Sequence, residues 1–146
     1  MNNDDAAPGR ERYPYFSTIS TRWMDNDIYG HINNTHYYSF FDTVIAGYLV
    51  SEGGFQFATA PVIGFAVESR CRYRRPLAFP QEIHMGLRVA HLGNSSVRYE
   101  VGVFTDDEPQ AAADGYFVHV FVTRETNKPS PIPDRIRTAL KRLMLL

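Results

Sequence analysis

The sequence has little cysteine, little net charge and no long hydrophobic run. Cys71 is the only cysteine among the 146 residues, so neither an internal disulfide nor a cysteine-based zinc site can form. The formal net charge of −1 gives no electrostatic reason to expect a nucleic acid or an anionic membrane as partner. No run of about 18 apolar residues is present to span a membrane, and residues 1–15 contain no apolar segment of a secretory signal. We therefore expect a cytoplasmic protein with no membrane insertion and no nucleic-acid partner.

Several catalytic and metal-binding patterns are also missing. The sequence contains no G-x-S-x-G motif and no HExxH arrangement. Asp25 and Asp27 have the spacing that begins a calcium loop. That loop fails because Tyr29 stands where an oxygen ligand is needed and His36 stands where a glutamate is needed. A zinc site built from Asp27, His31 and His36 lacks a third strong ligand. We expect no metal ion and no other cofactor.

The pattern of apolar residues predicts an α+β fold. The length fits one domain, with residues 1–15 as a flexible N-terminal segment and residues 16–146 as the folded part. Apolar residues from Tyr37 to Leu49 recur at the spacing of a helix face, whereas the later segments alternate with period two. The expected strands are residues 16–23, 62–74, 83–90, 97–103 and 111–123, and the expected helices are residues 31–52 and a short one after residue 133.

One predicted strand carries both apolar and cationic side chains. The alternation in residues 62–74 places Phe65, Cys71 and Tyr73 on one face. Cys71 is therefore expected to pack in the core and not to act as a nucleophile. The other face presents a row of arginines, which by default is a solvated surface: Arg70, Arg72 and Arg74.

A dense polar cluster stands just before the long predicted helix. Residues 23–34 read WMDNDIYGHINN, and the helix is expected to open near Gly30. The first amides of a helix have no partner within it, and here they would point back toward the loop that carries Asp27. Those amides favour a developing negative charge. A carboxylate beside such a helix end is a minimal site for acyl transfer. The simpler interpretation is a helix cap made by Asp25 or Asp27.

Residues 25–37, which read D-N-D-x-x-G-H-I-N-N-x-x-Y, resemble the signature of the 4-hydroxybenzoyl-CoA thioesterase branch of the hotdog-fold acyl-CoA thioester hydrolases. Residues 73–76, which read Y-R-R-P, resemble the end of a strand in that family. The resemblance implies a hotdog fold, with an antiparallel five-stranded sheet wrapped around one long central helix. It also implies a homodimer or homotetramer, in which two copies join their sheets edge to edge and build the active sites at their interface.

The resemblance assigns roles to individual residues. Asp27 falls on the catalytic carboxylate, either as nucleophile or as general base, and Asp25 then shapes the loop. Backbone amides between His31 and Asn34 fall on the oxyanion donors. Aromatic side chains on the helix are expected to line the substrate pocket, or else simply to form core: Tyr37, Tyr38 and Phe41. The arginine row supplies candidates for binding the CoA phosphates, chiefly Arg72 and Arg74.

The predicted function is hydrolysis of acyl-CoA thioesters to free acid and CoA. Two alternatives stay open at this point: a hotdog dehydratase or isomerase acting on a related thioester, and a non-catalytic protein that binds acyl-CoA or acyl-carrier-protein thioesters. The sequence offers no second carboxylate or histidine clearly placed for proton abstraction, which favours hydrolysis. The preferred acyl chain is not evident from the residues.

Overall fold

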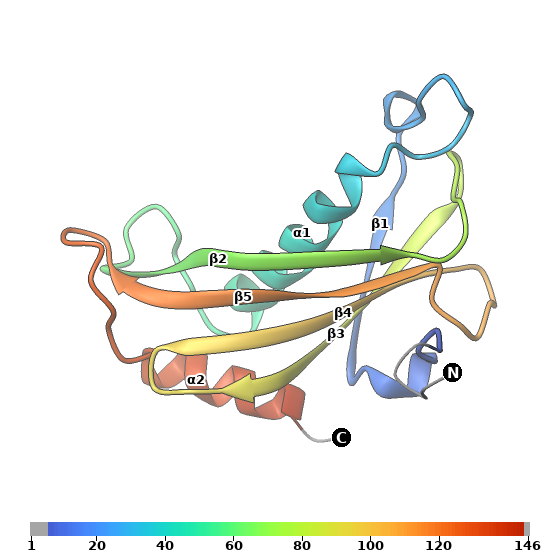
Figure 1. Ribbon diagram of the computed structural model, residues 1–146. Coiled ribbons are helices and arrows are strands. Elements are labelled where there is room, and N and C mark those ends of the chain that lie inside the picture. Colours follow the sequence, from blue (N-terminus) through green and yellow to red (C-terminus); the bar gives the residue numbers. More distant parts are fainter. Residues whose placement is uncertain (1–5, 145–146) are drawn as a thin grey trace.

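Five antiparallel strands form one sheet in the order β1-β3-β4-β5-β2, as the computed structural model shows for residues 6–144 (Figure 1). The strands are β1 (Tyr15–Ser20), β2 (Val62–Tyr73), β3 (Glu82–Leu92), β4 (Ser96–Thr105) and β5 (Ala113–Thr123). Strands β1 and β2 are therefore the two edges of the sheet. Because β2 pairs only with β5, its outer edge has no strand beside it among the described residues.

The long helix α1 (Thr35–Ser51) lies across one face of the sheet (Figure 1). The short helix α2 (Asp134–Lys141), followed by a 3₁₀ turn (Arg142–Met144), packs beside it, and the Tyr48 hydroxyl donates to the Ala139 carbonyl at 2.5 Å. Both helices bury apolar side chains in one continuous core with the sheet. The predicted α+β architecture, with its long helix and short C-terminal helix, is thus confirmed. No helix within residues 6–144 has the length and apolar character needed to cross a membrane.

Helix α1 begins four residues later than we predicted. Residues 26–32 form a tight hairpin instead, in which the Asp27 amide donates to the His31 carbonyl at 2.9 Å. Gly30 has a φ of 80°, a left-handed conformation that favours glycine and allows this turn. The Asn33 side chain then accepts hydrogen bonds from the Thr35 amide at 3.0 Å and hydroxyl at 2.9 Å, so the helix starts at Thr35.

A β-bulge in β2 divides the apolar face that the sequence predicts for this strand. The register with β5 shifts between Ala66 and Glu68. As a result Phe65 lies opposite Val120 on the face away from α1, whereas Cys71 packs against the core beneath the helix. A bulge adds one residue to one strand and so reverses the alternation beyond it.

Residues 8–15 of the N-terminal segment, which we expected to be flexible, contact the rest of the fold. Residues 1–5 lie outside the described part of the chain. The Tyr13 side chain is buried on the sheet face opposite α1, where its ring lies over Gly86 and Gly102. A Cβ on either glycine would come within 2.7 Å of that ring, so the absence of side chains creates the space it occupies. The Arg10 amide also donates to the Pro109 carbonyl at 3.2 Å.

Candidate active site

Asp25 and Asp27, two residues apart, have different surroundings. The Asp25 side chain is 2% exposed, and its carboxylate accepts hydrogen bonds from the amide of Arg22 at 2.8 Å and from its guanidinium at 3.1 and 2.8 Å. Burial by itself would raise the pKa of Asp25, but these hydrogen bonds and the positive charge of Arg22 bring the pKa below its usual value. Asp25 therefore stabilises the loop as an anion, as we predicted.

Asp27, in contrast, lies at the surface of an open hollow of about 390 Å³. Its Oδ1 accepts a hydrogen bond from the Tyr29 amide at 2.9 Å, which fixes the carboxylate at the start of the hairpin. The hollow is lined by Asp27, His31, Ile32, Asn34, Tyr37, Tyr73, Arg74, Arg75 and Pro76. We call it the loop hollow. The structure thus brings five of the predicted site residues together: Asp27, His31, Asn34, Tyr37 and Arg74.

Two of the four amides expected to stabilise an oxyanion already have partners. The Ile32 amide donates to the Leu77 carbonyl at 2.7 Å, and the Asn33 amide donates to the Asp25 carbonyl at 2.9 Å. Within residues 6–144 the amides of His31 and Asn34 have no hydrogen-bond partner. Both residues line the loop hollow with Asp27, so two unbonded donors and one carboxylate border the same space.

Aromatic side chains close one side of the loop hollow. The rings of Tyr37 and Tyr73 meet edge to face with centroids 5.1 Å apart. The Tyr73 hydroxyl donates to the Asn34 carbonyl at 3.1 Å and so joins the end of β2 to the start of α1. Burial raises the pKa of each hydroxyl to about 12, so both remain protonated near neutral pH.

Three predicted site residues lie outside the loop hollow. Phe41 is fully buried in the core, and the partly exposed Tyr38 packs edge to face against it. Phe41 is therefore a core residue, which was the alternative role expected for the aromatic side chains of the helix. Arg72 lies on the other face of the sheet, in a separate hollow described below.

Arg74 already forms an ion pair, and Cys71 is held as a protonated thiol. Arg74 lines the loop hollow, but its guanidinium is 2.6 Å from the Asp114 carboxylate in an ion pair. Burial raises the pKa of the Cys71 thiol to about 11, which keeps it in the unreactive thiol form. No three histidine, cysteine or acidic side chains within residues 6–144 are grouped so as to hold a metal ion.

Sequence reasoning missed Tyr73 and Arg75 as lining residues. They come from the end of β2, nearly forty residues after the polar cluster, and only the fold brings the two segments together. The Y-R-R-P segment at residues 73–76 was the available signal, because a strand end that resembles the family is a candidate for the site.

Comparison with known proteins gives the family of the chain. Residues 21–140 match the sequence model of the thioesterase-like superfamily. The chain belongs to this superfamily. The match includes the polar hairpin, all of α1 and the whole of strands β2 to β5. The resemblance based on residues 25–37 is therefore confirmed.

Individual relatives of this thioesterase-like protein agree with the assignment. The long-chain acyl-CoA thioesterase FadM of Escherichia coli K12 is 25% identical over 127 residues, which cover 86% of this chain and 96% of the relative. The crystal structure of the PA5185 protein of Pseudomonas aeruginosa PAO1 is 53% identical with a TM-score of 0.94, covering 95% of this chain and 97% of that one. The PA2801 protein of Pseudomonas aeruginosa is 29% identical with a TM-score of 0.82, covering 88% and 98% of the two chains. These matches confirm the predicted hotdog fold.

Proposed function

We propose that this protein hydrolyses acyl-CoA thioesters to a free acid and CoA, with Asp27 as the catalytic carboxylate. The observation that carries this proposal is the loop hollow, in which Asp27 shares one space with the unbonded amides of His31 and Asn34. Thioester hydrolysis needs these two elements, a group that attacks or activates water and donors that stabilise the oxyanion. The similarity to a long-chain acyl-CoA thioesterase supports the substrate class.

The reaction follows from the positions of these groups. The Asp27 carboxylate either takes a proton from a water molecule as that water attacks the thioester carbon, or attacks the carbon itself. In both cases the carbonyl oxygen becomes an oxyanion, and the amides of His31 and Asn34 donate to it. The tetrahedral species then expels the CoA thiolate, which takes the proton held by Asp27 on the general-base route and a solvent proton on the direct route. On the direct route a mixed anhydride forms at Asp27, and water cleaves it to release the acid and restore the carboxylate.

We also propose that two copies assemble through the edge of β2. This edge has no neighbouring strand within residues 6–144, and its Phe65 and Val67 side chains are 57% and 52% exposed. The loop beside Asp27 exposes more apolar surface, with Trp23 at 76% and Ile28 at 94%. An open strand edge and apolar side chains beside the site are features that a second copy would cover. A homodimer, or a homotetramer made of two dimers, fits both.

A panel of acyl-CoA substrates with a thiol reagent tests the proposed hydrolysis. Hydrolysis releases thiol continuously, so the signal should exceed one equivalent per protein chain and grow with time. Cys71 alone can contribute at most one equivalent. No continuous release from any chain length, together with hydration or isomerisation of an unsaturated acyl-CoA, would replace the proposal by a dehydratase or isomerase. Binding without any turnover would leave a thioester-binding protein.

A further inference from the structure

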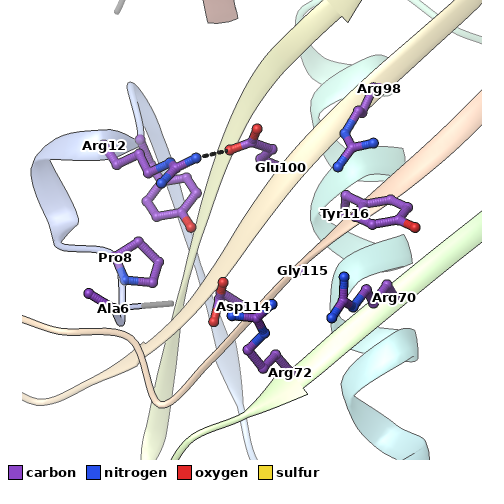
Figure 2. A pocket seen from close by; sticks show the side chains of 11 residues that line it. Ala6, Pro8, Arg12, Arg70, Arg72, Arg98, Glu100, Asp114, Gly115 and Tyr116 are labelled. Carbon is purple, nitrogen blue, oxygen red and sulfur yellow. Dashed lines mark hydrogen bonds and ion pairs between the residues drawn. The ribbon is translucent and has the colours of Figure 1, made fainter. Parts of the chain in front are cut away.

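A second hollow lies on the face of the sheet opposite α1, where the N-terminal segment meets β2, β4 and β5 (Figure 2). Its volume is about 220 Å³. It is lined by Ala6, Pro8, Arg12, Tyr13, Arg70, Arg72, Arg98, Glu100, Asp114, Gly115 and Tyr116. We call it the outer hollow. Four of these side chains are arginines and two are carboxylates, so its lining is cationic.

The two carboxylates of the outer hollow are already paired. Glu100 is 2.7 Å from the guanidinium of Arg12 (Figure 2). It is also 3.5 Å from the guanidinium of Arg88, a neighbour outside the lining. Asp114 is 2.6 Å from the guanidinium of Arg74, which belongs to the loop hollow. Within residues 6–144 neither carboxylate forms an ion pair with Arg70 or Arg98.

Arg70 and Arg98 stand on either side of the Tyr116 ring and keep their hydrogen-bond donors available (Figure 2). The guanidinium carbon of Arg98 is 3.9 Å from the centroid of that ring, which holds the side chain in position. The Tyr116 hydroxyl donates to Glu68, a third carboxylate near this face, at 2.6 Å. Within residues 6–144 neither the Arg70 nor the Arg98 side chain has a hydrogen bond or an ion pair.

We propose that the outer hollow binds the phosphate groups of a nucleotide, with Arg70 and Arg98 as its principal cations. Guanidinium groups bind phosphate with paired, charge-assisted hydrogen bonds. Two such groups on separate strands, with Arg12 on the opposite wall, favour a ligand that carries more than one phosphate over a single phosphate ion. The Tyr13 ring packs over Gly86 and Gly102, and this packing fixes the position of the neighbouring Arg12.

The position of the outer hollow relative to Asp27 suggests one source of the nucleotide. Arg70 lies three residues before Tyr73 on β2, a distance of about 10 Å along a strand. The two side chains point to opposite faces, so the end of β2 separates the outer hollow from the loop hollow. The nucleotide end of a CoA thioester bound at Asp27 is one source, and in that form the inference rests on the proposed function. A free nucleotide is the other.

Calorimetric titration tests the site without any turnover, using adenosine 3′,5′-bisphosphate and, separately, inorganic phosphate. We expect the bisphosphate to bind more tightly than phosphate, with an affinity that falls as salt rises. Arg70→Gln and Arg98→Gln should each weaken binding about tenfold or more, whereas Lys141→Gln on α2, which removes the same charge elsewhere, should leave it unchanged. Equal binding by wild type and both arginine variants, or no binding of the bisphosphate, would overturn the proposal.

Kinetics with two substrates identify the source of the nucleotide. If the ligand is part of the substrate, both arginine variants should raise KM for an acyl-CoA and leave KM for the same acyl pantetheine unchanged, because pantetheine lacks the nucleotide. If the ligand is a free nucleotide, the variants should lose bisphosphate binding while KM for acyl-CoA stays as in the wild type. A protein that binds the bisphosphate through Arg70 and Arg98 but cleaves no thioester would retain this site and refute the proposed hydrolysis.

Discussion

The carboxylate of Asp25 accepts three hydrogen bonds from Arg22, one from its amide and two from its guanidinium. This pair closes the 3₁₀ turn at Trp23–Asp25, directly before the hairpin that presents Asp27. One aspartate of the polar cluster thus stabilises the loop, whereas Asp27 borders the loop hollow.

Replacing Asp25 with Asn should reduce the stability of the fold more than the catalytic activity. The loss of the charge should lower the free energy of unfolding by about 2 kcal/mol at neutral pH, the scale of hydrogen bonds to an ionised group. Because the pKa of Asp25 is lowered in the folded state, its contribution is present above the usual carboxyl pKa and is lost as the pH falls below about 4. Urea unfolding should show that the wild type and Asp25→Asn differ in the free energy of unfolding at pH 7. This difference should shrink at pH 3. A difference independent of pH would contradict this role.

His119 should produce a stability change at a higher pH. It is buried beneath α1, with its Nδ1 3.2 Å from the Tyr99 hydroxyl, and burial lowers its pKa to about 4. The unfolded chain therefore binds more protons between pH 4 and about 6.5, so stability should rise with pH across that window, by about 3 kcal/mol. His119→Gln, which can keep the bond to Tyr99 but does not titrate, should flatten the slope in urea unfolding. NMR titration should show the ring neutral at pH 6, and a ring that is protonated there would refute the assignment.

Gly102 should not tolerate a methyl group, because Tyr13 occupies the space. A Cβ at this position would lie 2.7 Å from the Tyr13 ring and 2.8 Å from that of Phe104. Gly102→Ala should displace the N-terminal segment and cost about 1–3 kcal/mol in the free energy of unfolding. Gly47→Ala is the control, since nothing lies within 4 Å of its Cβ position inside α1, and it should stabilise by about 0.5–1 kcal/mol. Thermal unfolding compares the two, and equal Tm shifts would show that the contact is unimportant.

The exposed edge of β2 should govern assembly. Light scattering of the wild type is expected to give a dimer or a tetramer. Val67→Lys places a charge at this edge and should shift the mass toward the monomer and reduce activity with it. Met144→Lys, at a partly exposed position after α2, should change neither quantity. A fully active wild-type monomer would remove both the edge contact and the shared site.

The sequence predicted elements more reliably than their exact ends. The period of apolar residues from Tyr37 to Leu49 was enough to identify α1, because burial on one face dictates that spacing. Its start was placed too early, since the Asn33 side chain accepts from the Thr35 amide and the preceding residues form a hairpin. The bulge near Val67 was not visible either, because a bulge leaves each half of the strand with a normal alternation.

Apart from Arg74, the candidate site was predictable only where it is contiguous in the chain. Asp27, His31 and Asn34 fall within one short motif, and the loop hollow contains all three. Tyr73 joins them from β2 through a hydrogen bond to the Asn34 carbonyl, a contact that depends on the complete sheet. The burial of the Tyr13 ring was not predicted for a similar reason, since it depends on two glycines that lie opposite each other on β3 and β4.

The central claim is that Asp27 carries out the chemistry, and the turnover of Asp27→Asn tests it most directly. The substitution keeps the size of the side chain and the oxygen that accepts from the Tyr29 amide, but removes the negative charge. With a saturating acyl-CoA, kcat should fall at least about a hundredfold, the scale of losing a general base, while Tm stays close to that of the wild type. Asp25→Asn, measured beside it well below its own Tm, should keep most of its activity. Near-normal turnover by Asp27→Asn, with the larger loss in folded Asp25→Asn, would contradict the account.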